Sequence, residues 1–397
     1  MACQTIPVSI TGSNFSTVIH PTLPIVASAI NQGMQIQIMY LSDNRTEVIR
    51  SEVLKQATMA PNMAFHQTEP RLATSSGQLH NTLEYHSGCG YLSPKVTIYQ
   101  LSTDGTCESH PIATLVGHSS PVTAISFCPD DSSQIATGDN EGEIRIWKIH
   151  CSVGSEGSEG SVSSVGSEGS EGSKGSVGSM GCVRFWKFNG SEASVSFVSS
   201  VGSVGSVGSV KCVSVFKSPF STQSSVSIFL ISSIYWMNQN TLVASHWNGV
   251  VQRIQYNKAD EKFEVQSFRT ATPILTCTRG HPSGDFFVTG GSGPKDGTIQ
   301  VWSNTSFENI CTLDSISSDI ISMEYDTTRG LLILGCVKEV VIVSISPAGD
   351  AMHVLSRNAL HRRYVTTVAV HTVDTADGVE TRILSGTNGG SLVLSRI

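Results

Sequence analysis

The chain alternates short apolar runs with turns rich in Gly, Pro, Asp and Ser, and the clearest example lies at residues 113–148. Within it, three apolar runs follow one another at roughly ten-residue spacing: 122–127, 135–138 and 144–147. In the last run, Ile144 and Ile146 point to one face of a strand, whereas Arg145 and Trp147 point to the other. The pattern predicts an antiparallel meander that is apolar on both faces. Such a sheet needs neighbours on both sides.

The 113–148 unit resembles a WD40 repeat, because Gly117-His118 opens it, a Glu141-Gly142 turn precedes its last strand, and Trp147 ends it. The resemblance implies a β-propeller, in which four-stranded blades repeat around an axis and leave only short edges. It also implies a hydrogen-bonded tetrad inside the blade, formed by His118, Thr137, Glu141 and Trp147. Glu141 stands where the family has Asp, and Lys148 replaces the family's final Asp.

The same order of runs and turns recurs along the chain, giving seven units in all. They lie at residues 15–40, 59–101, 113–148, 231–256, 273–303, 320–345 and 361–395. Seven blades of about 40–45 residues each need roughly 280–315 residues, and the chain has 397. We therefore expect an all-β fold: a single seven-bladed propeller of four-stranded antiparallel blades.

Two further units carry tetrad-like residues. In 273–303 these are Thr289, Asp296 and Trp302, and the unit lacks a tetrad histidine, because Gly280-His281 lies before a turn and not in the opening loop. In the last unit His361 occupies the position of His118. We interpret these side chains as structural, since a network inside a blade also satisfies the indole N–H.

The last unit ends at Ile397 without a fourth strand. The N-terminal run Thr5–Ile10 is free to supply it, which would close the ring and remove two bare sheet edges. In this interpretation residues 1–151 hold the closing strand and blades 1–3, and residues 211–397 hold the remaining blades.

Residues 152–210 form a low-complexity insertion built largely from Gly-Ser-Val and Gly-Ser-Glu triplets, which we expect to be disordered. The fourth strand of blade 3 is predicted at one of two apolar runs, 182–188 or 211–216. A degenerate eighth repeat and a translated non-coding tract are the alternatives to a disordered loop. The sequence leaves these open.

Composition narrows the class of partner and the compartment. Charged residues are 14% of the chain and the formal net charge is −7, which argues against a nucleic-acid partner. The N-terminus does not resemble a signal peptide, and the most apolar window, 226–237, is too short to span a bilayer. Ten cysteines lack any C-x-x-C spacing, so neither a disulfide framework nor a zinc site is indicated. We expect a cytoplasmic or nuclear protein that is neither secreted nor bound to a membrane.

No catalytic, cofactor-binding or metal-binding motif stands out in the sequence. There is no G-x-S-x-G, P-loop or H-E-x-x-H pattern, and Gly290–Gly293 lies in a turn with no helix after it. A propeller enzyme is therefore the less favoured alternative. Arg362-Arg363 is only partly similar to the Phe-Arg-Arg-Gly motif of phosphoinositide-binding propellers, which leaves a lipid- or ligand-binding propeller as a second alternative.

The favoured function is a non-catalytic scaffold that binds other proteins or peptides, within a multiprotein complex. Loops that converge at one end of the propeller would carry the binding residues. Our candidates are Trp247, Lys295, Arg362 and Tyr364, because Trp, Tyr and Arg dominate the energetics of interfaces.

Overall fold

The computed structural model describes most of the repeats and little of the insertion. The described residues are 2–6, 16–30, 35–42, 47–55, 62–76, 94–103, 109–150, 186–188, 191–193, 209–217, 230–257, 262–281, 283–293, 296–316, 318–326, 329–375, 378–387 and 391–397. Within them, the secondary structure consists of β-strands, and no helix is long and apolar enough to cross a membrane.

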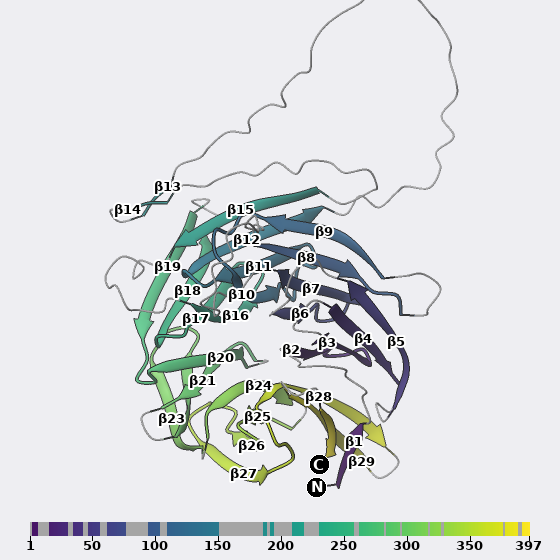
Figure 1. The fold of residues 1–397 in the computed structure, drawn as a ribbon. Coiled ribbons are helices and arrows are strands. Elements are labelled where there is room, and N and C mark those ends of the chain that lie inside the picture. Colours follow the sequence, from purple (N-terminus) through teal and green to yellow (C-terminus); the bar gives the residue numbers. More distant parts are fainter. Residues whose placement is uncertain are drawn as a thin grey trace, which may run out of the picture.

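Seven four-stranded antiparallel sheets stand around a central axis, as Figure 1 shows. Blades 1 to 4 are β2–β5 (Ser16–Ile19, Ile25–Ile30, Gln35–Leu41, Val48–Lys55), β6–β9 (Met63–Phe65, Arg71–Ser76, Lys95–Gln100, His110–Val116), β10–β12 with β15 (Val122–Phe127, Gln134–Asp139, Glu143–His150, Ser209–Lys217) and β16–β19 (Ile231–Asn238, Thr241–His246, Val250–Asn257, Lys262–Arg269). Blades 5 to 7 are β20–β23 (Ile274–Gly280, Phe286–Ser292, Gly297–Ser303, Asn309–Ile316), β24–β27 (Ile320–Asp326, Leu331–Cys336, Val340–Ile345, Met352–Asn358) and β28–β30 with β1 (Val365–Thr375, Gly378–Thr387, Leu392–Arg396, Ala2–Ile6). The predicted seven-bladed propeller is confirmed.

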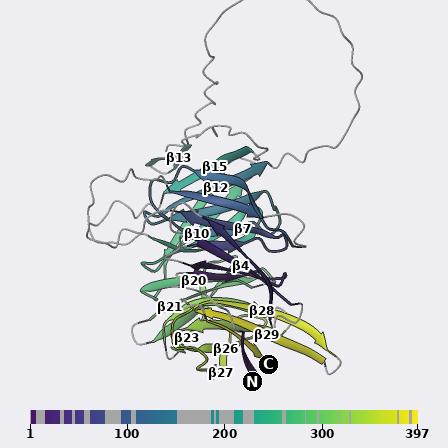
Figure 2. The same cartoon turned by 45° about the vertical axis from the view of Figure 1, so that its right-hand side comes forward.

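The ring is closed by the N-terminal strand. β1 runs antiparallel to β30, with Ala2 opposite Arg396 and Ile6 opposite Leu392. The two termini consequently lie side by side (Figures 1 and 2). The closing strand covers Ala2–Ile6, whereas the sequence predicted Thr5–Ile10; residues 7–10 lie outside the described part of the chain.

The fourth strand of blade 3 comes from the far side of the low-complexity segment. β15 pairs with β12 along its whole length, from Glu143 opposite Lys217 to His150 opposite Ser209. Of the two candidate runs, the later one therefore forms the strand, which begins two residues before the expected boundary. β13 (Trp186–Phe188) pairs instead with β14 (Ser191–Ala193) in a separate two-stranded sheet. The described residues of the insertion (186–188, 191–193 and 209–210) thus lie in strands, contrary to the disorder expected of 152–210, and the rest of the insertion lies outside the described part of the chain.

The hydrophobic core lies between the blades. Each of the seven junctions between neighbouring sheets contains its own cluster of buried apolar side chains. At the junction of blades 5 and 6, for example, Ile299 and Val301 pack with Met323 and Leu332, and all four are almost fully buried. This is the arrangement that the two apolar faces of each meander require.

A repeated β-bulge links the innermost strands. In blades 3 to 7 the register between the first two strands skips the second or third residue of the innermost strand. In blade 3 the skipped residue is Thr123, whose hydroxyl donates to the carbonyl oxygen of Ile231 in blade 4 at 2.8 Å. In blade 5 it is Thr276, which donates to Ile320 of blade 6 at 2.5 Å. In these two blades the bulge turns a threonine side chain toward the next blade.

The strand order also fixes which loops share an end of the ring. Because successive strands are antiparallel, the turn between the second and third strands of a blade lies at the same end as the connection to the next blade. We call this the upper end. Turns between first and second strands, and between third and fourth strands, lie at the lower end.

Candidate functional site

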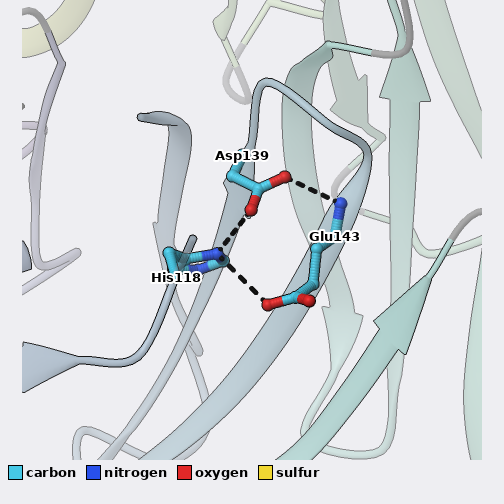
Figure 3. Close-up of side chains that lie close together, drawn as sticks. All are labelled: His118, Asp139 and Glu143. Atoms are coloured by element: carbon cyan, nitrogen blue, oxygen red, sulfur yellow. Dashed lines mark hydrogen bonds and ion pairs between the residues drawn. The ribbon is translucent and has the colours of Figure 1, made fainter. Parts of the chain in front are cut away.

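Blade 3 contains a buried polar network centred on His118, part of which Figure 3 shows. His118 lies in the loop before β10. Its Nδ1 is 2.9 Å from Oδ2 of Asp139, and its Nε2 is 2.7 Å from the hydroxyl of Thr137. The same hydroxyl accepts a hydrogen bond from the indole N–H of Trp147 at 2.8 Å. The loop before β10 and the strands β11 and β12 are thereby joined.

The acid of this network is Asp139, which corrects the prediction of Glu141. Asp139 is fully buried, and its second oxygen accepts the backbone N–H groups of Glu141 and Glu143 at 3.0 and 2.9 Å. Glu141 is exposed and takes part only through its backbone. The reason is strand geometry: Thr137 and Asp139 are two residues apart on β11 and share a face, while Glu141 lies in the turn beyond it.

A second carboxylate adjoins the histidine. An oxygen of Glu143 lies 3.6 Å from His118 Nδ1, and Arg145 forms an ion pair with the same carboxylate at 2.5 Å (Nε to Oε1). The guanidinium of Arg145 lies 5.9 Å from the centre of the Trp147 ring. Glu143, Arg145 and Trp147 alternate along β12, so all three point to the face that carries His118.

His118, Asp139 and Glu143 have the chemistry of a divalent-cation ligand set, and one ligand atom from each lies within 4.8 Å of the others. These atoms already have partners, however: both ring nitrogens of His118 are bonded, Asp139 accepts two backbone N–H groups, and Glu143 pairs with Arg145. A cation would have to displace these bonds. The cluster is therefore best described as a network that ties the blade together.

Blade 5 contains a reduced form of the same network. The indole N–H of Trp302 donates to the hydroxyl of Thr289 at 2.9 Å. Asp296, which the sequence analysis grouped with them, is exposed and lies outside this pair. Gly291 takes the position that Asp139 has in blade 3, and a Cβ there would collide with the carbonyl oxygen of Ile274. Blade 5 therefore has no room for the acid.

Blade 7 uses hydroxyl groups in place of the acid. His361 Nε2 lies 2.8 Å from the hydroxyl of Ser385, and its Nδ1 lies 3.4 Å from that of Ser391. Burial without a nearby carboxylate lowers the pKa of His361 to about 4. The neutral imidazole is thus the form that this blade accommodates.

The predicted partner-binding residues differ in their surroundings at the upper end. Trp247 lies in the turn between β17 and β18 and is half-buried; its backbone bonds to Leu230 before blade 4 and to Leu275 at the start of blade 5. Arg362 and Tyr364 lie in the connection between β27 and β28 and are exposed. Lys295 lies outside the described residues. The structure thus brings Arg362 and Tyr364 together and places Trp247 two blades away.

Lys338 is a neighbour of Arg362 and Tyr364 that sequence reasoning missed. It lies in the turn between β25 and β26, and it is exposed. A β-bridge joins Val337 to Tyr364, and the backbone N–H of His361 donates to the carbonyl of Lys338 at 3.2 Å. The sequence did contain one indication of this residue: the turn has no glycine at the position where the turns of two other blades have one.

The lower end has a polar depression of about 540 Å³ between blades 3 and 4. Carboxamides dominate its lining, together with Asp130, Tyr256 and Glu264. A carboxylate oxygen of Asp130 accepts the backbone N–H of Gln239 at 3.1 Å, and Glu264 lies 3.5 Å from the amide nitrogen of Asn257. These contacts stabilise the rim of the depression.

Comparison with known families gives two matches within the chain. The family described as "WD domain, G-beta repeat" matches residues 109–148 and 263–303. These stretches cover β9–β12 and β19–β22, so each sequence repeat begins with the outer strand of one blade and ends within the next. No curated protein matches the sequence.

Comparison with solved structures addresses the fold. A crystal structure of RRP9 WD40 repeats is similar over 100% of this chain and 97% of that chain, with a TM-score of 0.62 and 10% sequence identity. In all, 1470 chains of solved structures match. An architecture shared so widely does not by itself indicate a partner.

Proposed function

Because this chain is a WD40-repeat β-propeller, we propose that it is a non-catalytic scaffold that binds other proteins or peptides at its upper end. The observation that carries the proposal is the exposure of Tyr364, a residue that is 49% accessible at the junction of blades 6 and 7. An aromatic side chain on a loop held by a closed ring can bury a large area with little loss of conformational entropy.

The loops around Tyr364 are held in place by hydrogen bonds, which supports a binding role. The connection that carries it is bonded to the turn at Lys338 and, through the ring of His361, to Ser385 in blade 7. A partner would meet a surface that is already organised, and less of the binding energy would be lost in ordering the loop.

The polar clusters inside the blades support a scaffold over an enzyme. The catalytic-looking arrangement of histidine, hydroxyl and acid in blade 3 has its Thr137 hydroxyl fully buried and bonded to two nitrogens. A substrate has no route to that hydroxyl, so the group has a structural explanation that needs no reaction.

We place this function in the cytoplasm or nucleus, in a multiprotein complex and without nucleic acid, lipid or cofactor. Five of the cysteines in the described part of the chain are free, and four of these five are buried: Cys128, Cys212, Cys277 and Cys336. Free thiols of this kind suit a reducing compartment.

Affinity purification of the full chain with variant Tyr364→Ala tests the proposal. The matched control is Tyr256→Ala at the lower end, which removes the same atoms from the opposite face. We expect partners of the wild-type protein, identified by mass spectrometry, to be lost with Tyr364→Ala and retained with Tyr256→Ala, while both variants keep their melting temperature within a few degrees. Undiminished recovery with Tyr364→Ala would show that the binding face is elsewhere.

A further inference from the structure

Four exposed side chains form one corner of the upper end, at the junction of blades 6 and 7. They are Lys338 from the turn between β25 and β26, and Arg362, Arg363 and Tyr364 from the connection between β27 and β28. We call this set the basic corner. It combines three cationic groups with one accessible aromatic ring.

The two loops of the basic corner are fixed to each other. The bond from His361 N–H to the carbonyl of Lys338 and the bridge between Val337 and Tyr364 join them directly. The backbone segments that carry the three cations are therefore held side by side.

The charges of the basic corner are unneutralised within the described part of the chain. Among the described residues, no acidic side chain forms an ion pair with Lys338, Arg362 or Arg363. Glu339, the residue next to Lys338, instead lies 3.8 Å from Arg357 and accepts from the Ser318 hydroxyl at 3.2 Å. The whole chain carries a net charge of −7, so this corner is opposite in sign to the molecule around it.

Lys338 occupies its position at the expense of backbone strain. Its φ is +69°, whereas Gly142 and Gly249, in the corresponding turns of blades 3 and 4, have φ of +82°. A residue with a Cβ atom is disfavoured by about 1–2 kcal/mol in this left-handed region of backbone conformation, whereas glycine adopts it without strain. Strained positions of this kind tend to occur where the side chain has a function.

We propose that the basic corner binds a carboxylate-rich segment of a partner protein, with Tyr364 packing against the segment and the three cations pairing with its Asp and Glu side chains. This inference rests on the proposed function and adds the chemical class of the partner. Arginine is suited to the task, because its guanidinium can engage a carboxylate through two hydrogen bonds.

The surroundings favour a peptide over a bilayer. A membrane-binding surface combines cations with apolar side chains that enter the lipid. Among the described residues, the other large exposed apolar side chains lie on the outer strands of the blades and not in the loops of this corner: Ile49, Val53, Val116, Val213, Ile310 and Leu355. Tyr364 alone offers little apolar surface to a bilayer, whereas a single aromatic ring can pack against a short extended peptide.

Fluorescence anisotropy with a short labelled peptide of alternating Glu and Gly tests the proposal directly, with a Gln-Gly peptide as the uncharged probe. The variant is Arg362→Glu/Arg363→Glu. The matched control is Lys211→Glu/Lys262→Glu, which changes the net charge equally on exposed outer strands of blades 3 and 4. Thermal melting of each protein verifies that it folds.

We expect the wild-type protein and the control to bind the Glu-Gly peptide equally, and the variant to bind at least about tenfold more weakly. Raising the salt from about 50 to about 250 mM should weaken wild-type binding, since the pairs are exposed. Equal binding by variant and wild type, or an equal loss in the control, overturns the inference. The inference is also overturned if the wild-type protein does not bind the peptide but does bind vesicles of phosphatidylcholine with a phosphoinositide, and if that vesicle binding depends on the two arginines.

The two proposals fail in different ways. If Tyr364→Ala loses the cellular partners but Arg362→Glu/Arg363→Glu retains them, the upper end binds partners without using its charge, and only the acidic-partner inference is wrong. If Tyr364→Ala retains the partners, the proposed function is wrong, whatever the peptide does.

Discussion

The hydroxyl of Thr123 in blade 3 donates a hydrogen bond of 2.8 Å to the carbonyl oxygen of Ile231 in blade 4. The same hydroxyl lies 3.3 Å from the carbonyl of Gly138 in its own blade. Asn62 forms an equivalent link from blade 2 to Val122, and Thr276 forms one from blade 5 to Ile320. Polar contacts between innermost strands thus supplement the apolar clusters at the blade junctions.

Replacement of Thr123 by Val should destabilise the propeller by about 1 kcal/mol, because it removes the donor and preserves the shape and strand preference of the side chain. Urea or thermal unfolding measures the loss. The control is Thr312→Val on the exposed strand β23, which we expect to change stability by less than about 0.5 kcal/mol. Equal effects of the two substitutions would mean that the link between the blades contributes nothing.

The network in blade 3 should be more sensitive than that in blade 5. The Thr137 hydroxyl bonds both His118 and Trp147, whereas the Thr289 hydroxyl bonds only Trp302 among the side chains that the structure describes. We expect Thr137→Val to cost about 3 kcal/mol and Thr289→Val about 1–2 kcal/mol, since each leaves buried nitrogen atoms without a partner. Both residues are almost fully buried, so the comparison is matched in burial. A larger loss for Thr289→Val in thermal unfolding would contradict this account.

The fold was accessible from the sequence because each blade repeats the same alternation of apolar strand and turn. Even the weakest units retain it: Ile25–Ile30 is buried throughout, as a central strand between two sheets must be. Closure by the N-terminus followed from the missing fourth strand of the last unit. Its register did not, because the pairing is set by contacts between residues almost four hundred positions apart.

The acid of the blade 3 network could have been found by strand alternation. Thr137 and Asp139 share a face of β11, and Glu143, Arg145 and Trp147 share a face of β12. The family spacing pointed instead to Glu141, which lies in the turn. The clustering of Lys338 with Arg362 was beyond the sequence, because it depends on a bridge between loops separated by a whole hairpin.

Replacement of Lys338 by Gly should stabilise the fold by about 0.5–1 kcal/mol, since glycine adopts a φ of +69° without strain and loses only part of that gain to chain entropy. Lys338→Ala retains the strain and should leave the melting temperature nearly unchanged. Both variants should bind the Glu-Gly peptide more weakly than the wild-type protein, because both lack the charge. Equal melting temperatures for Gly and Ala would show that the turn is not strained.

The stability of blade 7 should depend on pH through His361. Burial lowers its pKa from 6.5 in the unfolded chain to about 4 in the folded protein, so the unfolded state binds a proton first as the pH falls. Stability should therefore decrease between about pH 6.5 and pH 4, while above pH 6.5 the two states are equally deprotonated and this histidine has no effect. His361→Gln keeps a hydrogen-bonding group near Ser385 and removes the titration, so its free energy of unfolding should fall less over this range. His353→Gln, an exposed histidine on β27, should parallel the wild-type protein. Urea unfolding at pH 7, 6, 5 and 4 measures all three, and parallel curves for wild type and His361→Gln would show that His361 is not buried in its neutral form.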